Sequence, residues 1–198
     1  VGTDVAGALA LARQNHIVHG DVKAGNVLIT ESGRAKLTDF GISRSPSDGR
    51  SSAWSAGSLS ALSPEQLLGK PLDERADLFA LGCLLYRMLC GEQPFHRNGT
   101  LDPELLLKRD PKPMAEIVTG DVELPDPLVA IISALLQKDP AKRPANTRRV
   151  RQVLRTVMRT LPMSTSNSLL REARPCFRQE SPEDMPPLIP KGLGQQGR

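Results

Sequence analysis

Residues 19–26 read His19-Gly20-Asp21-Val22-Lys23-Ala24-Gly25-Asn26, and thirteen residues after Asn26 the chain reads Asp39-Phe40-Gly41. This spacing supplies an acid that can orient a hydroxyl group, a cation for a transferring phosphate, and two oxygen ligands for magnesium. Phosphoryl transfer requires mainly positioning and charge neutralisation around the γ-phosphate. We expect Asp21 to accept the hydroxyl proton. Asn26 and Asp39 are the expected metal ligands, because amide and carboxylate oxygens suit a hard cation that keeps part of its water shell.

The spaced set is much harder to obtain by chance than any one of its members, because Asp and Asn are ordinary turn residues. The set resembles the catalytic loop and the magnesium loop of the protein kinase family. The resemblance runs from residue 4 to about residue 161 and covers only the C-terminal lobe of that fold. It implies a structure that is mainly α with a small β-hairpin, belonging to an intact domain of the α+β class. It also implies ATP and Mg²⁺ as cofactors.

A short hairpin is predicted directly after the first motif. Val27-Leu28-Ile29 and residues 35–38 read as strands, and the turn between them contains Gly33, which can adopt a positive φ. The hairpin would carry Asn26 at its start and Asp39 at its end. It would therefore bring the two expected metal ligands close together.

Apolar spacing predicts helices over residues 4–14, 74–89, 128–136 and 146–161. The second of these is apolar on nearly every side, which is typical of a helix at the centre of a domain, and Asp73 is its expected N-cap. Ser63-Pro64-Glu65 is expected to open another short helix after a mobile Ser- and Gly-rich loop over residues 44–61. We expect residues 1–161 to form the partial kinase domain. Residues 162–198, rich in proline, are expected to form a linker or a disordered tail.

The family resemblance assigns supporting roles to residues outside the two motifs. Ser63-Pro64-Glu65 stands where the family has Ala-Pro-Glu, and Arg143 matches the arginine that pairs with this glutamate. Asp77 matches the acid that braces the backbone of the catalytic loop, although it would also complement the dipole of its helix. Ser58 matches the hydroxyl residue that bridges the catalytic acid and lysine.

Other positions concern the nucleotide and the acceptor. Lys23 matches the lysine that steadies the γ-phosphate in serine/threonine kinases, so the resemblance favours serine and threonine acceptors on protein substrates. Leu28 matches the residue beneath the adenine ring. Lys23, Leu28 and the two metal ligands are therefore the expected cofactor contacts, and His19, Phe40 and Gly41 complete the motifs as structural support.

Two departures from the family pattern are visible. Gly20 replaces the arginine that usually binds a phosphorylated activation loop, so we expect activity that does not depend on that phosphorylation. No Gly-rich loop, strand lysine or partner glutamate of the N-terminal lobe is present. We therefore expect the chain to be a fragment with poor nucleotide affinity and turnover on its own.

The net charge of +4 and the pI near 9.2 invite a nucleic-acid interpretation. However, much of the excess lies between Arg143 and Arg159, where apolar residues at helical spacing indicate a buried stripe and the arginines a solvated face. Aromatic residues make up only 3% of the chain, so nucleobase stacking is not expected. No apolar run is long enough to span a membrane. The three cysteines lack paired spacing, which favours a reducing, cytoplasmic location.

Two other functions remain open at this point. Small-molecule phosphotransferases of the aminoglycoside or choline type share His-Gly-Asp and the following Asn, but typically lack a counterpart of Arg143. A catalytically silent kinase-like scaffold would keep the fold and lose some of the residues that bind ligands. The four such residues of the two motifs are all present here: Asp21, Lys23, Asn26 and Asp39. Residues 171–198 could tether a further domain or dock a partner. The substrate protein and the oligomeric state cannot be read from the sequence.

Overall fold

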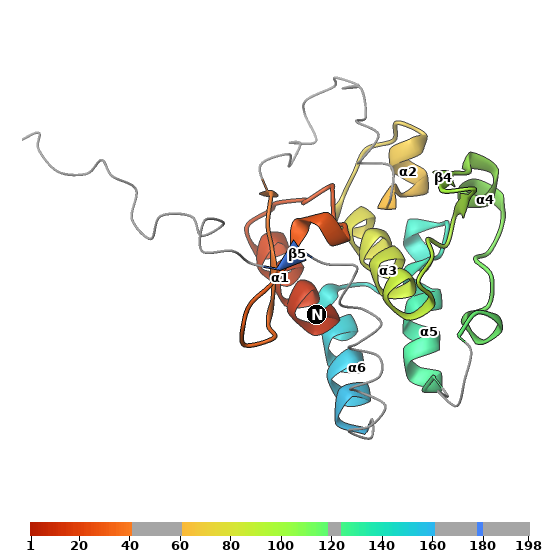
Figure 1. Cartoon of the computed structure of the whole chain (residues 1–198). Helices are drawn as coiled ribbons and strands as arrows, with labels where there is room; N and C mark the ends of the chain where they lie inside the picture. Colours follow the sequence, from red (N-terminus) through yellow and green to blue (C-terminus); the bar gives the residue numbers. More distant parts are fainter. Residues whose placement is uncertain (41–60, 119–123, 161–177, 180–198) are drawn as a thin grey trace, which may run out of the picture.

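The computed structural model describes residues 1–40, 61–118, 124–160 and 178–179. Figure 1 shows a helical body with a small sheet at one side. The longer helices are α1 (Gly2–Gln14), α3 (Glu74–Cys90), α5 (Asp126–Leu135) and α6 (Thr147–Thr160). The short helices are η1 (Ala24–Asn26), α2 (Pro64–Leu67), α4 (Pro103–Lys108), η4 (Met114–Glu116) and η5 (Pro140–Lys142). The strands are β1 (Val27–Ile29), β2 (Ala35–Leu37), β3 (His96–Arg97), β4 (Thr100–Leu101) and β5 (Arg178–Gln179).

Helix α3 forms the centre of the core, as its apolar composition predicts. Eleven of its residues, from Ala76 to Tyr86, are buried. The Asp73 side chain caps its start by accepting a hydrogen bond from the Arg75 N–H, and Gly91 ends it in the left-handed conformation with φ of 73°. A Cβ on Gly82 would lie 2.8 Å from the Leu135 Cβ, so glycine permits the close approach of α5.

Helices α1, α5 and α6 cover this core. Each buries a stripe of apolar residues at helical spacing, for example Leu128, Ile131, Ile132 and Leu135 of α5. The start of α1 packs against the second half of α6. A Cβ on Gly2 would lie 3.4 Å from Leu154 Cδ1, which shows how closely the two helices approach each other. The two helices thus run side by side (Figure 1).

The small sheet has the order β2-β1-β5. β1 and β2 form the predicted antiparallel hairpin, with Leu28 opposite Lys36, and Gly33 takes φ of 75° in the turn. β5 adds to the other edge of β1 in the parallel direction, with Leu28 opposite Arg178. The pair 178–179 is the part of the 162–198 segment that the structure describes, and the division of the chain at residue 161 stays a prediction.

The mainly helical fold with a small hairpin is confirmed, and the predicted helices agree with α1, α3, α5 and α6 within two residues at each end. The predicted short helix at Ser63 is also present as α2. Helix α4 and the β3–β4 hairpin were not predicted. None of the described helices is long and apolar enough to cross a membrane. The loop over residues 44–61, Gly41 and Ser58 lie outside the described residues.

Candidate active site

The hairpin holds the first expected metal ligand next to the strand that leads to the second. The Thr38 N–H donates to the Asn26 carbonyl oxygen at 2.8 Å, and the Thr38 hydroxyl donates to the same oxygen at 3.2 Å. Asp39 follows directly, with an exposed side chain and a left-handed φ of 61°. This conformation is uncommon for a residue other than glycine and is often found at functional sites.

Asp21 lies at the centre of a compact polar group. Its Oδ2 accepts hydrogen bonds from Lys23 Nζ at 2.7 Å and from Asn26 Nδ2 at 3.0 Å, and Asn26 Nδ2 also donates to the Asp21 carbonyl oxygen at 2.8 Å. Within the described residues, both hydrogen bonds of the Asn26 side chain are donated by its Nδ2. Its amide oxygen is the atom left for a metal ion. The cation and the amide also hold the carboxylate in one orientation, since hydrogen bonds with a charged partner are comparatively strong.

The backbone of this loop is fixed from α3. The Asp77 carboxylate accepts from the His19 N–H and the Gly20 N–H, both at 2.8 Å, and Asp77 is 3% exposed. Burial raises the pKa of this carboxyl, although the two backbone N–H groups act in the opposite direction. The bracing role expected for Asp77 has the geometry it requires.

His19 connects the catalytic loop to the end of the hairpin. Its Nδ1 accepts from the Asp21 N–H at 3.3 Å, so the ring proton of the neutral form belongs on Nε2, which lies 2.9 Å from the Thr38 carbonyl oxygen. The ring is fully buried and meets Phe40 edge-on, with 4.7 Å between centroids. His19 thus fixes the backbone on both sides of the loop.

Helix α2 also supports the loop. Its N-cap Ser63 and Gln66 form a capping box. The Gln66 side chain also donates from Nε2 to the Gly20 carbonyl oxygen at 2.9 Å. Sequence reasoning did not single out Gln66. The S-x-x-Q spacing of residues 63–66 signals the capping box, but nothing in it signals the contact with Gly20, which is 46 positions away in the chain.

Glu65 of α2 pairs with Arg143, as the family resemblance implied. Arg143 Nη1 and Nη2 donate to the two carboxylate oxygens at 2.5 Å and 2.8 Å. The guanidinium also donates to the backbone carbonyls of Arg75, Gln137 and Lys138 and lies over the Phe79 ring. Arg143 is 4% exposed, and its donors are well satisfied.

The residue expected beneath the adenine ring and the expected metal ligands need separate description. Leu28 is buried on β1, between Lys36 on β2 and the backbone of β5. Within the described residues no group of three or more His, Cys, Asp or Glu side chains could hold a metal ion, so a metal here would rely on Asn26, Asp39 and other oxygen donors. This set suits Mg²⁺, which usually keeps several water ligands.

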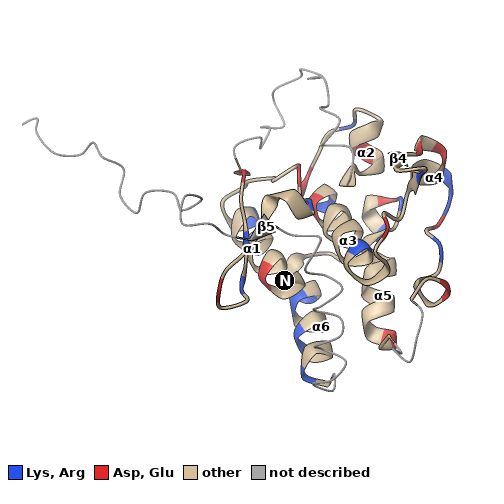
Figure 2. Cartoon of the chain, in the orientation of Figure 1, with Lys and Arg blue, Asp and Glu red and all other residues tan. Residues whose placement is uncertain are grey.

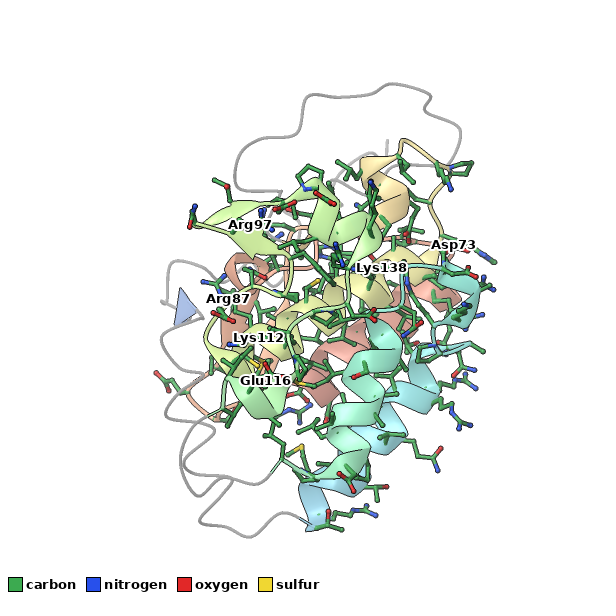
Figure 3. All side chains as sticks on the ribbon, turned by 90° about the vertical axis from the view of Figure 1, so that its right-hand side faces the viewer. Asp73, Arg87, Arg97, Lys112, Glu116 and Lys138 are labelled. Atoms are coloured by element: carbon green, nitrogen blue, oxygen red, sulfur yellow. The ribbon has the colours of Figure 1, made fainter. Side chains whose placement is uncertain are left out.

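A cavity of about 960 Å³ lies away from this group, at the opposite end of α3. Arg87, Arg97 and Lys112 line it, and Figure 3 shows them on one side of the molecule. Since Asp77 is in the first turn of α3 and Arg87 in the last, the cavity and the catalytic loop are separate places in the fold.

Residues 1–156 match the family model described as protein kinase domain. The chain belongs to the protein kinase family. It is 35% identical over 144 residues to the serine/threonine-protein kinase PknB of Mycobacterium leprae, which covers 71% of this chain and 23% of that protein. The PknB of Mycobacterium tuberculosis is 35% identical over 148 residues, covering 72% of this chain and 22% of the relative. A probable serine/threonine-protein kinase of Clostridium perfringens is 36% identical over 145 residues, a match that covers 72% of this chain and 21% of that protein.

The chain therefore spans less than a quarter of the length of these kinases. Within it, the structure brings together Asp21, Lys23 and Asn26 by direct hydrogen bonds, and Glu65 with Arg143. Asp39 is joined to the group through the backbone of the hairpin. The contributions of Gly41 and Ser58 stay predictions, because both lie outside the described residues.

Proposed function

We propose that the parent of this chain is a protein serine/threonine kinase and that residues 19–40 contain its phosphoryl-transfer site. The observation that carries the proposal is the Asp21 carboxylate, held by Lys23 at 2.7 Å and by Asn26 at 3.0 Å. An acid fixed in this way can receive a hydrogen bond from an acceptor hydroxyl. A cation lies beside it, where the charge of a transferring phosphate needs to be neutralised.

Each residue has a distinct role in this proposal. Asp21 orients the serine or threonine hydroxyl of a protein substrate and accepts its proton, and Lys23 stabilises the charge of the phosphate. The Asn26 amide oxygen and the Asp39 carboxylate hold Mg²⁺, and the apolar Leu28 side chain contacts the adenine ring. Mg-ATP, when bound, supplies the γ-phosphate and neutralises much of its charge.

The buried pair of Glu65 and Arg143 favours a protein kinase over a small-molecule phosphotransferase. It holds α2, and with it the Gln66 contact to the catalytic loop, in a fixed place. Such an anchor is useful where a long segment between the hairpin and α2 has to accommodate a protein substrate. The relatives, which are named serine/threonine kinases, support the same choice.

Gly20 carries the proposal that activity does not depend on phosphorylation of the segment between Asp39 and Ser63. Glycine supplies no cation for a phosphate, and its φ of 75° is a conformation that glycine adopts without the strain that other residues would have. Phosphatase treatment is expected to leave the rate of the parent protein nearly unchanged, and a strong loss would contradict this. The cytoplasmic location and a role in signalling also belong to this proposal. The two cysteines in the described part of the chain, Cys83 and Cys90, form no disulfide, which fits a reducing compartment.

The test is transfer of radiolabelled γ-phosphate by the full-length protein, with Mg²⁺ and a generic basic protein as substrate. Asp21→Asn and Asp39→Asn should each lower the rate about 10²- to 10⁴-fold. Asp110→Asn is the matched control, because Asp110 is exposed beyond α4 and should leave the rate unchanged. No transfer by the well-folded unmodified protein would favour a silent scaffold. Label on small molecules alone would favour the phosphotransferase.

A further inference from the structure

The positive charge of the chain is concentrated on one helix. The net charge of the chain is +4, and α6 alone carries five arginines and no acidic residue. The rest of the chain therefore has a net charge of −1. Figure 2 shows this distribution, with blue segments and no red along α6.

Four of these arginines form a row, which we call the α6 row: Arg148, Arg151, Arg155 and Arg159. Their spacing of three and four residues places them on one side of the helix, over about 16 Å of its length. Arg148, Arg155 and Arg159 are exposed. Among the described residues, no member of the row makes an ion pair, and the Arg151 Nε is buried without a hydrogen-bond acceptor.

Such a row is unfavourable for the helix by itself. Like charges three or four residues apart repel one another and destabilise an isolated helix. An acidic residue on a neighbouring helix could relieve the repulsion. Helix α5, which packs against α6, has one acidic residue, Asp126, and it makes no ion pair with the row. Helix α1, which also packs against α6, has one acidic residue, Asp4. Asp4 is engaged elsewhere, with the Arg34 Nε at 3.1 Å and the Ala35 N–H at 3.1 Å.

The surface beside the row is neutral and partly apolar. Thr3 of α1 contacts Met158, and Gly7 lies against the Arg151 guanidinium. Leu11 follows them at the same four-residue spacing and so lies on the same face of α1. Met158 and Leu11 are each 62% exposed, which is unusual for large apolar side chains in the described part of the chain.

We propose that the α6 row docks this domain on a lipid bilayer surface that contains anionic lipids. Lipid phosphates supply the negative charge that the row lacks, and guanidinium groups bind phosphate in a bidentate manner. Each cation near such a surface contributes to binding. Met158 and Leu11 flank the row and would contact the boundary between headgroups and acyl chains, where exposed apolar side chains are favourable.

A nucleic acid fits this surface less well. Neither α1 nor α6 contains an aromatic residue on which a base could stack, and aromatic residues make up only 3% of the whole chain. The apolar face of α6, with Val150, Leu154 and Val157, is buried against the core. The face of α6 that is left for a partner is therefore the one that carries the arginines.

The test is co-sedimentation of the 198-residue chain with vesicles of phosphatidylcholine that contain about one-third phosphatidylglycerol, at about 0.1 M salt. The triple variant Arg148→Gln, Arg155→Gln, Arg159→Gln should bind about 100-fold more weakly. The control is Lys70→Gln, Lys108→Gln, Arg109→Gln, which removes three exposed cations elsewhere. Both variants have a net charge of +1, so only the position of the charge differs.

Binding that is kept by the control, lost by the α6 variant and absent with pure phosphatidylcholine vesicles would support the proposal. Equal losses in both variants would overturn it, because they would indicate a response to net charge alone. Absence of binding by the unmodified chain would also overturn it. Tighter binding of the unmodified chain to duplex DNA, lost in the same α6 variant, would assign the row to nucleic acid instead. Matching circular dichroism spectra and unfolding midpoints would show that the variants remain folded.

Discussion

Arg143 and Glu65 form a buried bidentate ion pair between positions 78 residues apart in the chain. The arginine lies directly after η5, and the glutamate lies in the first turn of α2. Because α2 also contacts the catalytic loop through Gln66, the pair ties the segment between α5 and α6 to the candidate active site. Its value lies in this connection, since a buried pair of charges contributes little net stability compared with apolar side chains of similar volume.

We expect Arg143→Met to lower the free energy of unfolding by about 3–5 kcal/mol, because it leaves the Glu65 carboxylate buried without a partner. Urea-induced unfolding measures this. Arg109→Met, at an exposed position, is the matched control and should change the value by less than about 0.5 kcal/mol. Adding Glu65→Leu to Arg143→Met should recover part of the loss. A single-variant loss below about 1 kcal/mol would mean that the pair is not buried as described.

Asp77→Ala should destabilise the domain, because it leaves the N–H groups of His19 and Gly20 without an acceptor. Each buried donor left unpaired costs about 1–3 kcal/mol. Asp77→Asn keeps one acceptor oxygen and should be intermediate. The order of urea midpoints should therefore be unmodified, then Asn, then Ala. Hydrogen exchange at His19 and Gly20 should accelerate in the same order, and unchanged exchange in Asp77→Ala would argue against the bracing contact.

Gly82→Ala tests the packing of α3 on α5. A Cβ at this position would lie 2.8 Å from the Leu135 Cβ and 3.0 Å from Leu136 Cδ2, so the helices would have to move apart. Overpacking of this kind costs about 1–3 kcal/mol, although alanine favours a helix more than glycine does. Gly25→Ala is the control, since a Cβ there would have no heavy atom within 4 Å. Thermal unfolding should show a lower midpoint for Gly82→Ala alone.

The sequence predicted the parts of this site that depend on local pattern or on family motifs. The hairpin follows from two short strands and a Gly33 turn, and the central position of α3 follows from its apolar composition. The partner of Arg143 followed from the family motif alone, because nothing local to Arg143 identifies a residue 78 positions away.

The contact between Gln66 and Gly20 could not be predicted, since it depends on how α2 packs against the loop. The short α4 was missed for another reason: its six residues are too few for a clear period. Its N-terminal signal was present, however. Asp102 caps the helix by accepting from two backbone N–H groups, and Pro103 follows at the first helical position.

Lys138 should give the domain a distinctive pH dependence. Its Nζ lies 3.4 Å from the centroid of the Phe95 ring and donates to the Leu105 carbonyl oxygen (Lys138 is labelled in Figure 3). Burial lowers the pKa of Lys138 from 10.5 to about 8. Between these values the unfolded chain binds more protons than the folded chain, so this residue makes stability rise with pH in that range.

Other groups act in the opposite direction, so a matched variant is needed to isolate this effect. Burial raises the pKa of Cys83 from 9.0 to about 12 and that of Cys90 to about 11, and both lower stability as the pH rises above 9. These contributions are largely common to the unmodified chain and Lys138→Met. The Lys138 ammonium lowers the pKa of Cys83, so its removal raises that pKa further and acts in the same direction as the difference expected here. The stability of the unmodified chain relative to Lys138→Met should therefore increase as the pH rises from about 8 toward 10.5. Urea unfolding at a series of pH values measures the difference; Lys108→Met, at an exposed lysine, should show no such trend, and a flat difference for Lys138→Met would mean that Lys138 keeps its ordinary pKa.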